Sequence, residues 1–192
     1  MSKKPALNRR KFLGLSAAAL TVGATSLTVP AQAIPYYNPS AVRQLSFYNT
    51  HTNEMYSGVY FYGGGYDRTV MSQFSYLMRD HRNEEVARID YRLFDVLHQL
   101  QARLQYFNVV QLISGYRSPE SNALLASTSG GVAKNSYHMR GQATDIRIDG
   151  VPTEYVQRAA LSLGAGGVGF YPASDFVHVD TGPVRTWGYG AG

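Results

Sequence analysis

Cysteine is absent from this chain of 192 residues. That absence excludes disulfide bonds, a thiolate nucleophile, a cysteine-ligated metal ion and a cysteine-linked lipid anchor. Any metal ion must therefore be held by His, Asp or Glu side chains. Charged residues make up only 16% of the sequence and hydrophobic residues 44%, which is typical of a globular chain with a buried core.

The first 33 residues have the pattern of an export signal. A positively charged segment (residues 3–11) precedes an apolar stretch (residues 12–29), and Ala31-Gln32-Ala33 forms a small-x-small cleavage pattern. The Arg9-Arg10 pair resembles a twin-arginine signal, and a Sec-type signal with a chance arginine pair is the alternative. An uncleaved membrane anchor is less favoured, because the apolar stretch is short and interrupted by polar residues.

Cleavage after Ala33 changes the charge of the protein. The whole chain has a formal net charge of +5, which by itself suggests an acidic partner such as nucleic acid or a membrane surface. The signal contains five of the 18 Lys and Arg residues and none of the 13 Asp and Glu residues. The remaining chain carries 13 residues of each sign, so we expect no nucleic-acid partner and no stable membrane anchor after cleavage.

Hydrophobic periodicity predicts an irregular lead-in at residues 34–41 and one folded domain at residues 42–192. Strands are predicted for a hairpin over residues 42–61 with its turn at 51–53, and for residues 109–114, 143–148, 168–171 and 176–180. Helices are predicted for residues 69–78, for 84–107 with Asn83 as N-cap, for a segment that opens at Ser118-Pro119-Glu120 and ends at Gly130-Gly131, and for 153–163 capped by Thr153. Without strict alternation of helix and strand, we expect an α+β fold with a small, mostly antiparallel sheet flanked by helices.

Two histidines and one aspartate form a candidate metal site. His138 and Asp145 are separated by a turn that contains a glycine, and His178 lies on a later predicted strand. Two imidazoles and one carboxylate with an open fourth position are the composition of a catalytic zinc site. Taken singly, each histidine is more often a hydrogen-bonded structural residue, and Asp145 could cap a turn. The remaining histidines, which we interpret as surface or helix-face residues, are His51, His81 and His98.

Four segments make this pattern more specific. They are SGYRS (residues 114–118), SYHMRGQATDI (136–146), GGVGFYP (166–172) and FVHVDTGPVRTW (176–187). Together they resemble the zinc murein peptidases of the D-Ala-D-Ala carboxypeptidase superfamily, and within it the YcbK-like murein endopeptidase group, over about residues 42–188. The resemblance implies a Hedgehog/D,D-peptidase-like fold and Zn²⁺ held by His138, Asp145 and His178.

The resemblance also implies roles for residues around the metal. Arg117 would bind the scissile carbonyl oxygen or a stem-peptide carboxylate and stabilise the developing oxyanion. Ser136 would form a hydrogen bond near the ligand His138. Asp175 would be the general base, although relatives often have the longer Glu there. Asp180 is the alternative base or, failing that, a carboxylate that supports the ligands.

Aromatic residues and glycines beside these motifs carry weaker predictions. Tyr116 is a candidate substrate-binding residue, and Tyr137 and Tyr171 are candidates for lining the cleft, with plain packing as the alternative for each. We expect the glycines at 166, 167 and 169 to allow a close backbone approach. For Trp187, packing is favoured over substrate stacking.

These observations predict an exported zinc-dependent murein endopeptidase that hydrolyses peptide cross-links of peptidoglycan, in the periplasm or outside the cell. Its partners would be peptidoglycan stem peptides. Two alternatives remain: a D,D-carboxypeptidase or dipeptidase of the same superfamily, and a non-catalytic cell-wall-binding domain.

Overall fold

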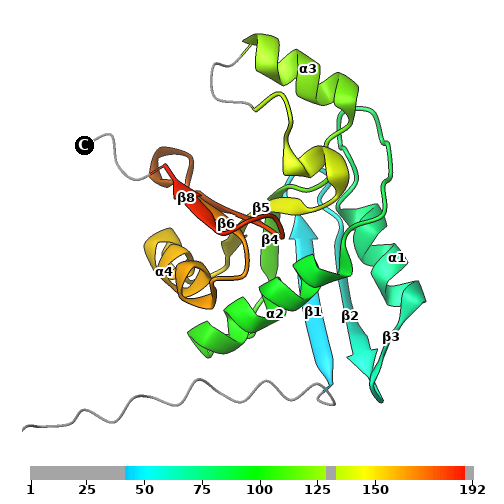
Figure 1. Ribbon diagram of the computed structural model, residues 1–192. Coiled ribbons are helices and arrows are strands. Elements are labelled where there is room, and N and C mark those ends of the chain that lie inside the picture. Colours follow the sequence, from blue (N-terminus) through cyan, green and yellow to red (C-terminus); the bar gives the residue numbers. More distant parts are fainter. Residues whose placement is uncertain (1–41, 129–132, 189–192) are drawn as a thin grey trace, which may run out of the picture. The chain divides into compact units, whose positions relative to one another are not determined.

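The computed structural model describes residues 42–128 and 133–188 (Figure 1). The predicted export signal (1–33), the lead-in (34–41) and the helix end at Gly130-Gly131 lie outside these residues. The elements are, in chain order, β1 (Arg43–Asn49), β2 (Met55–Tyr62), β3 (Gly65–Tyr66), α1 (Arg68–Leu77), α2 (Tyr91–Leu104), β4 (Val110–Ser114), α3 (Pro119–Thr128), the 3₁₀ turn η1 (Tyr137–Arg140), β5 (Ala143–Ile148), α4 (Thr153–Leu163), β6 (Gly167–Tyr171), the 3₁₀ turn η2 (Pro172–Ser174), β7 (Phe176–Asp180) and β8 (Arg185–Trp187). Within the described ranges, every helix is too short or too polar to cross a membrane.

The eight described strands form one sheet in the order β3-β2-β1-β4-β5-β7-β6-β8. The β1–β4 and β6–β8 pairs are parallel, and the other five neighbouring pairs are antiparallel. The predicted α+β class is confirmed, but the sheet is larger than expected and mixed. Its two edge strands, β3 and β8, were not predicted because runs of two and three residues are too short to show an alternating pattern.

Helices α1, α2 and α4 cover one face of the sheet, and the core lies between them (Figure 1). Phe47 on β1 contacts Phe74 of α1 and Phe94 of α2, with ring centroids 4.9 and 6.4 Å apart. Side chains alternate along each strand, so Ile146 and Ile148 of β5 and Val177 and Val179 of β7 enter this core while their neighbours point to the opposite face. The polar residues placed on that opposite face are Asp145, His178 and Asp180.

The central predictions of secondary structure are confirmed. Strands β1 and β2 form the expected hairpin, and the predicted strands at 143–148 and 176–180 coincide with β5 and β7. Ser118 caps α3 as predicted, since its hydroxyl oxygen accepts a hydrogen bond from the Ser121 amide at 3.1 Å.

One helix start and one helix cap were predicted wrongly, whereas the predicted bounds of α4 are confirmed. Helix α2 begins at Tyr91 and is capped by Asp90, because the preceding segment folds into a turn in which Glu84 has a φ of 61°. That turn is held by a backbone bridge between Asp80 and Glu85. Thr153 does not cap α4: the cap position is Pro152, and the Thr153 hydroxyl donates to Asp175 at 3.1 Å instead.

Candidate metal centre

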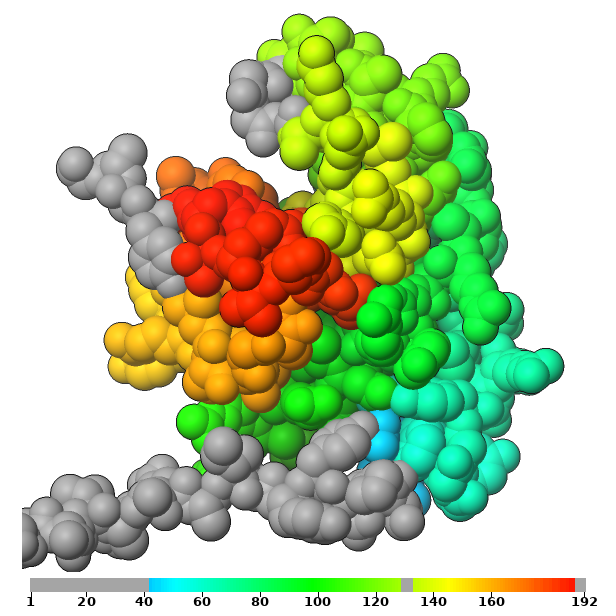
Figure 2. Space-filling view, in the orientation of Figure 1, coloured from blue at the N-terminus to red at the C-terminus, as the bar shows by residue number. Residues whose placement is uncertain are grey.

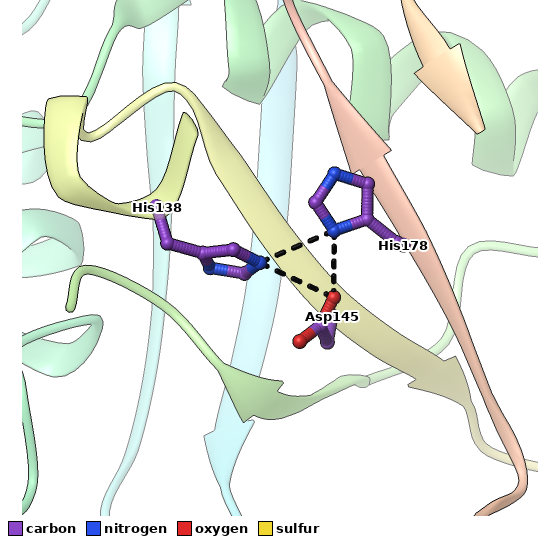
Figure 3. A group of neighbouring side chains, drawn as sticks. All are labelled: His138, Asp145 and His178. Carbon is purple, nitrogen blue, oxygen red and sulfur yellow. Dashed lines mark hydrogen bonds and ion pairs between the residues drawn. The ribbon is translucent and has the colours of Figure 1, made fainter. Parts of the chain in front are cut away.

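Neighbouring strands bring the predicted ligands together. Asp145 on β5 lies directly opposite His178 on β7, so the two side chains share one face of the sheet. The His178 Nδ1 is 2.8 Å from Asp145 Oδ1 (Figure 3). His138 comes from η1, and its Nε2 lies 3.2 Å from His178 Nδ1 and 3.3 Å from Asp145 Oδ1. All three side chains are buried, and their donor atoms lie within 4.8 Å of one another.

The η1 turn fixes the orientation of His138. The Ser136 hydroxyl accepts a hydrogen bond from the His138 amide, and Gly141 ends the turn with a φ of 62°. A side chain at Gly141 would lie 2.4 Å from the Arg88 carbonyl oxygen, so only glycine fits there. The His138 Nδ1 is 2.7 Å from the Gly115 carbonyl, which can only accept. Nδ1 therefore carries the hydrogen, and the lone pair of Nε2 faces Asp145 and His178.

Asp180 fixes His178 from the opposite side of its ring. The His178 Nε2 is 2.9 Å from Asp180 Oδ2, so an N–H there leaves the Nδ1 lone pair facing the other two ligands. Asp180 is fully buried and also accepts hydrogen bonds from Arg185 and from two backbone amides, Gly167 and Gly182. Burial raises the pKa of Asp180, but these bonds outweigh it and hold the pKa well below its usual value. Asp180 is thus an ionised supporting carboxylate.

The donor set fits a zinc ion. Two imidazole lone pairs and a carboxylate oxygen converge, which matches the nitrogen and oxygen donors that zinc takes from protein. Burial raises the pKa of Asp145, but His138 and His178 outweigh it and hold the pKa well below its usual range. Both rings are also oriented from outside by an acceptor, as metal-binding histidines usually are. His138, Asp145 and His178 could therefore hold a metal ion.

A cleft of about 630 Å³ opens over this group. Figure 2 shows the surface hollowed between the yellow segment around η1 and the red segment around β8. The residues that line it are Arg117, Ala133, Asn135, Ser136, Tyr137, His138, Asp145, Tyr171, Ser174, Phe176, His178, Arg185 and Trp187.

Arg117 presents its guanidinium to the cleft with few protein partners. Among the residues that the structure describes, its amino groups have only long bonds, 3.4 Å to Asn122 Oδ1 and 3.5 Å to Ser114 Oγ. Its buried Nε has no partner within the described ranges. The backbone N–H of Arg117 donates to the His138 carbonyl at 3.3 Å, which ties the arginine to the ligand turn. The guanidinium is therefore free to bind an anionic or carbonyl oxygen.

Two predicted site residues lie away from this cleft. Tyr116 is buried in the hydrophobic core, where its hydroxyl donates to Glu85 at 2.8 Å. Burial and this bond raise the pKa of Tyr116 to about 12. Asp175 is exposed, and its carboxylate accepts hydrogen bonds from Arg147 and Thr153, both at 3.1 Å. The structure thus brings Arg117, Ser136, Tyr137, Tyr171 and Trp187 into the cleft with the His–Asp–His group, and it does not bring Tyr116 or Asp175 there.

The glycines before and within β6 allow other parts of the chain to approach closely, a backbone segment in one case and side chains in the others. A side chain at Gly166 would collide with the Asp180 backbone, as the expected backbone approach requires. At Gly167 and Gly169 the collision would be with the side chains of Arg185 and Trp187. Those two side chains cross β6 over the glycines.

Two supporting groups were missed by the sequence analysis. They are the Gly115 carbonyl, which orients His138, and Arg185, which pairs with Asp180 at 2.6 Å. The Gly182-Pro183 turn pattern between Asp180 and Arg185 is the one sequence signal for the second contact. The remaining histidines lie outside the group, and His51 and His81 stack with ring centroids 3.8 Å apart.

A buried His–Asp–His group beneath a cleft that contains Arg117 is typical of hydrolases that use a metal ion. Comparison with known proteins gives the family. The chain belongs to the family described as peptidoglycan L,D-endopeptidase MepK, which it matches over residues 38–187. This membership confirms the resemblance to the zinc murein peptidases.

Curated relatives cover nearly the whole chain. "Peptidoglycan L,D-endopeptidase MepK" of Escherichia coli K12 is 46% identical over 180 residues, covering 94% of this chain and 97% of the relative. The protein of that name from Shigella flexneri gives the same values. "Probable peptidoglycan L,D-endopeptidase MepK" of Haemophilus influenzae is 42% identical over 181 residues, covering 94% and 95%. No solved structure gives a significant match.

Proposed function

We propose that this chain is an exported, zinc-dependent endopeptidase that cleaves peptide cross-links of peptidoglycan. The observation that carries the proposal is the buried group of His138, Asp145 and His178 beneath a cleft. Relatives that are 46% and 42% identical over nearly their whole length are named peptidoglycan L,D-endopeptidases. Their names support an internal bond between an L and a D centre as the target, in preference to removal of a terminal D-alanine.

Each residue of the site has a role that follows from its geometry. His138 Nε2, His178 Nδ1 and Asp145 Oδ1 hold the metal, and Asp180 and the Gly115 carbonyl keep the two rings oriented. When bound, Zn²⁺ supplies a water of lowered pKa and polarises a carbonyl oxygen. Arg117 donates hydrogen bonds to the oxygen on which negative charge develops.

Export fits this substrate, since peptidoglycan lies outside the cytoplasm. The predicted signal at residues 1–33 would deliver a formally neutral protein to the periplasm or beyond. The Arg9-Arg10 pair favours the twin-arginine route. A neutral surface suits stem peptides that carry both amines and carboxylates.

Digestion of purified muropeptide dimers tests the proposal. Residues 34–192 are incubated with one dimer joined through an L,D bond and another through a D,D bond, with chelator and with zinc restored, and the products are identified by mass spectrometry. We expect monomers from the L,D dimer only when zinc is present. Loss of terminal D-alanine alone would support the carboxypeptidase alternative, and unchanged dimers under every metal would overturn the enzymatic proposal.

Matched variants show whether hydrolysis comes from this site. His178→Ala should remove activity, because it deletes a metal ligand. His51→Ala is the control, because His51 is an exposed histidine outside the group, and it should retain activity.

A further inference from the structure

One row of residues crosses the sheet beside the metal ligands. Gly169 on β6 pairs with His178 on one side and with Trp187 on the other. A Cβ on Gly169 would lie 2.6 Å from the Trp187 ring, so the indole lies over the glycine. The indole also contacts His178, with ring centroids 5.0 Å apart. The absence of a side chain at Gly169 therefore lets Trp187 reach the metal centre.

Trp187 in turn holds the hydroxyl of Tyr171. The indole Nε1 lies 2.8 Å from the Tyr171 oxygen. An indole N–H can only donate, so the phenol oxygen accepts this bond and its own hydrogen remains uncommitted. Within residues 42–128 and 133–188, no protein atom accepts that hydrogen. The Tyr171 ring is fixed from a second side by Phe176, with centroids 4.5 Å apart and planes inclined by 22°.

Tyr171 and Arg117 face the same space. Both line the cleft, and Tyr171 lies two residues from Gly169 on β6, on the same face of the strand. The Trp187 indole contacts both the Tyr171 hydroxyl and the His178 ring. Burial lowers the pKa of Arg117, while Asp145 and Tyr171 oppose that change, which places both within electrostatic range of the guanidinium. Two hydrogen-bond donors with uncommitted hydrogens thus line the same cleft as His138, Asp145 and His178.

We propose that Tyr171 is a second catalytic hydrogen-bond donor, beside Arg117, to the substrate oxygen on which negative charge develops, and that Trp187 is a positioning residue for its hydroxyl. This role rests on the proposed peptidase function. The phenol keeps its proton throughout, because it donates a hydrogen bond and no O–H bond breaks. A preorganised donor to such an oxygen typically contributes about 10²- to 10³-fold in kcat.

Tyrosine-to-phenylalanine variants isolate the hydroxyl. Tyr171→Phe should lower kcat about 100-fold with little change in KM, zinc content or melting temperature. Tyr155→Phe is the matched control, because Tyr155 is exposed on α4 and is not among the residues that line the cleft, and it should retain wild-type kcat. A Tyr171→Phe enzyme with wild-type kcat would overturn the proposal.

A double-mutant cycle tests the positioning role of Trp187. Trp187→Phe keeps an aromatic ring but lacks the N–H, and we expect a loss of about tenfold in kcat from a misaligned hydroxyl. The double variant should then be no slower than Tyr171→Phe alone, because Trp187 acts through that hydroxyl. Additive losses would overturn this role.

A spectroscopic measurement checks the contact without turnover. Trp187 is the only tryptophan in the chain, so intrinsic fluorescence reports on it alone. Tyr171→Phe should shift the emission of the folded, zinc-loaded protein, and an unchanged spectrum would overturn the Trp187–Tyr171 hydrogen bond. If wild-type enzyme cleaves no dimer, the proposed function fails and this role with it. If wild type and Tyr171→Phe cleave equally well, only this role fails.

Discussion

The His178 ring is held between two carboxylates, with its Nδ1 2.8 Å from Asp145 and its Nε2 2.9 Å from Asp180. Asp180 is buried beneath Arg185, whose guanidinium lies 2.6 Å away. Asp180 therefore orients the ring and cannot face a substrate in the cleft. Asp180 therefore supports one of the proposed metal ligands and is not itself one of them.

Asp180→Asn should weaken metal binding without removing a ligand. The amide keeps the size of the side chain but loses the charge that attracts the His178 N–H and Arg185, and loss of such a support typically costs 10- to 100-fold in metal affinity. Zinc affinity is measured by competition with a chelator. Asp149→Asn, in an exposed turn, is the control and should bind zinc as wild type does. Equal affinity in both variants would mean that Asp180 does not support the site.

Asp175→Asn should leave hydrolysis within about twofold of wild type, because a surface change away from the site typically has a small effect. The Asp175 carboxylate is bonded to Arg147 and Thr153, and Asp175 is not among the residues that line the cleft. Rates on muropeptide dimers are compared at equal zinc content. A loss of tenfold or more with zinc retained would instead support the general-base role predicted from the sequence.

Gly169→Ala should destabilise the protein by about 1–3 kcal/mol, because the added methyl group would displace the Trp187 indole. The free energy of unfolding is measured in denaturant, and the emission of Trp187 is recorded in the same samples. Gly65→Ala is the control, since nothing lies within 4 Å of the position that its methyl group would take. Similar stabilities for the two variants would show that the indole does not lie over Gly169.

The stacked histidines should make stability depend on pH. Burial, His51 and Arg82 lower the pKa of His81 from 6.5 to about 4. Well above pH 6.5 the His81 ring is neutral in both the folded and the unfolded protein, and its contribution to the free energy of unfolding is complete. As the pH falls from 6.5 towards 4, the unfolded chain takes up the proton first, so the contribution is lost. The melting temperature of His81→Gln should therefore fall less than that of wild type over this pH interval. If the melting temperatures of the two proteins fall equally, His81 is not the group responsible.

The strands that carry the ligands could be predicted from the sequence. Residues 143–148 and 176–180 are short β-prone runs bounded by turns, and both coincide with strands of the structure. The spacing of His138 and Asp145 around Gly141 also indicated that the chain turns back there. The role of Asp180 could be predicted only in part. Its two-residue spacing from His178 predicts that both side chains lie on one face of the strand, but it does not show which ring nitrogen Asp180 contacts.

Features set by distant parts of the chain could not be predicted. The start of α2 depends on the Asp80–Glu85 bridge and on the bond from Tyr116 to Glu85, which local periodicity does not reveal. Likewise, Trp187 reaches His178 only because β8 pairs with β6 at a glycine. Local sequence predicts most of the helices and strands, whereas these contacts require the complete sheet.

Metal content shows directly whether His138, Asp145 and His178 hold a zinc ion. Wild-type protein and the variants His138→Ala, Asp145→Asn and His178→Ala are purified in the same zinc-containing buffer, dialysed and analysed by elemental mass spectrometry, with His51→Ala as control. We expect one zinc ion per chain in wild type and control, and a large loss in all three ligand variants. Full zinc occupancy in the ligand variants, or none in the wild type, would contradict this expectation.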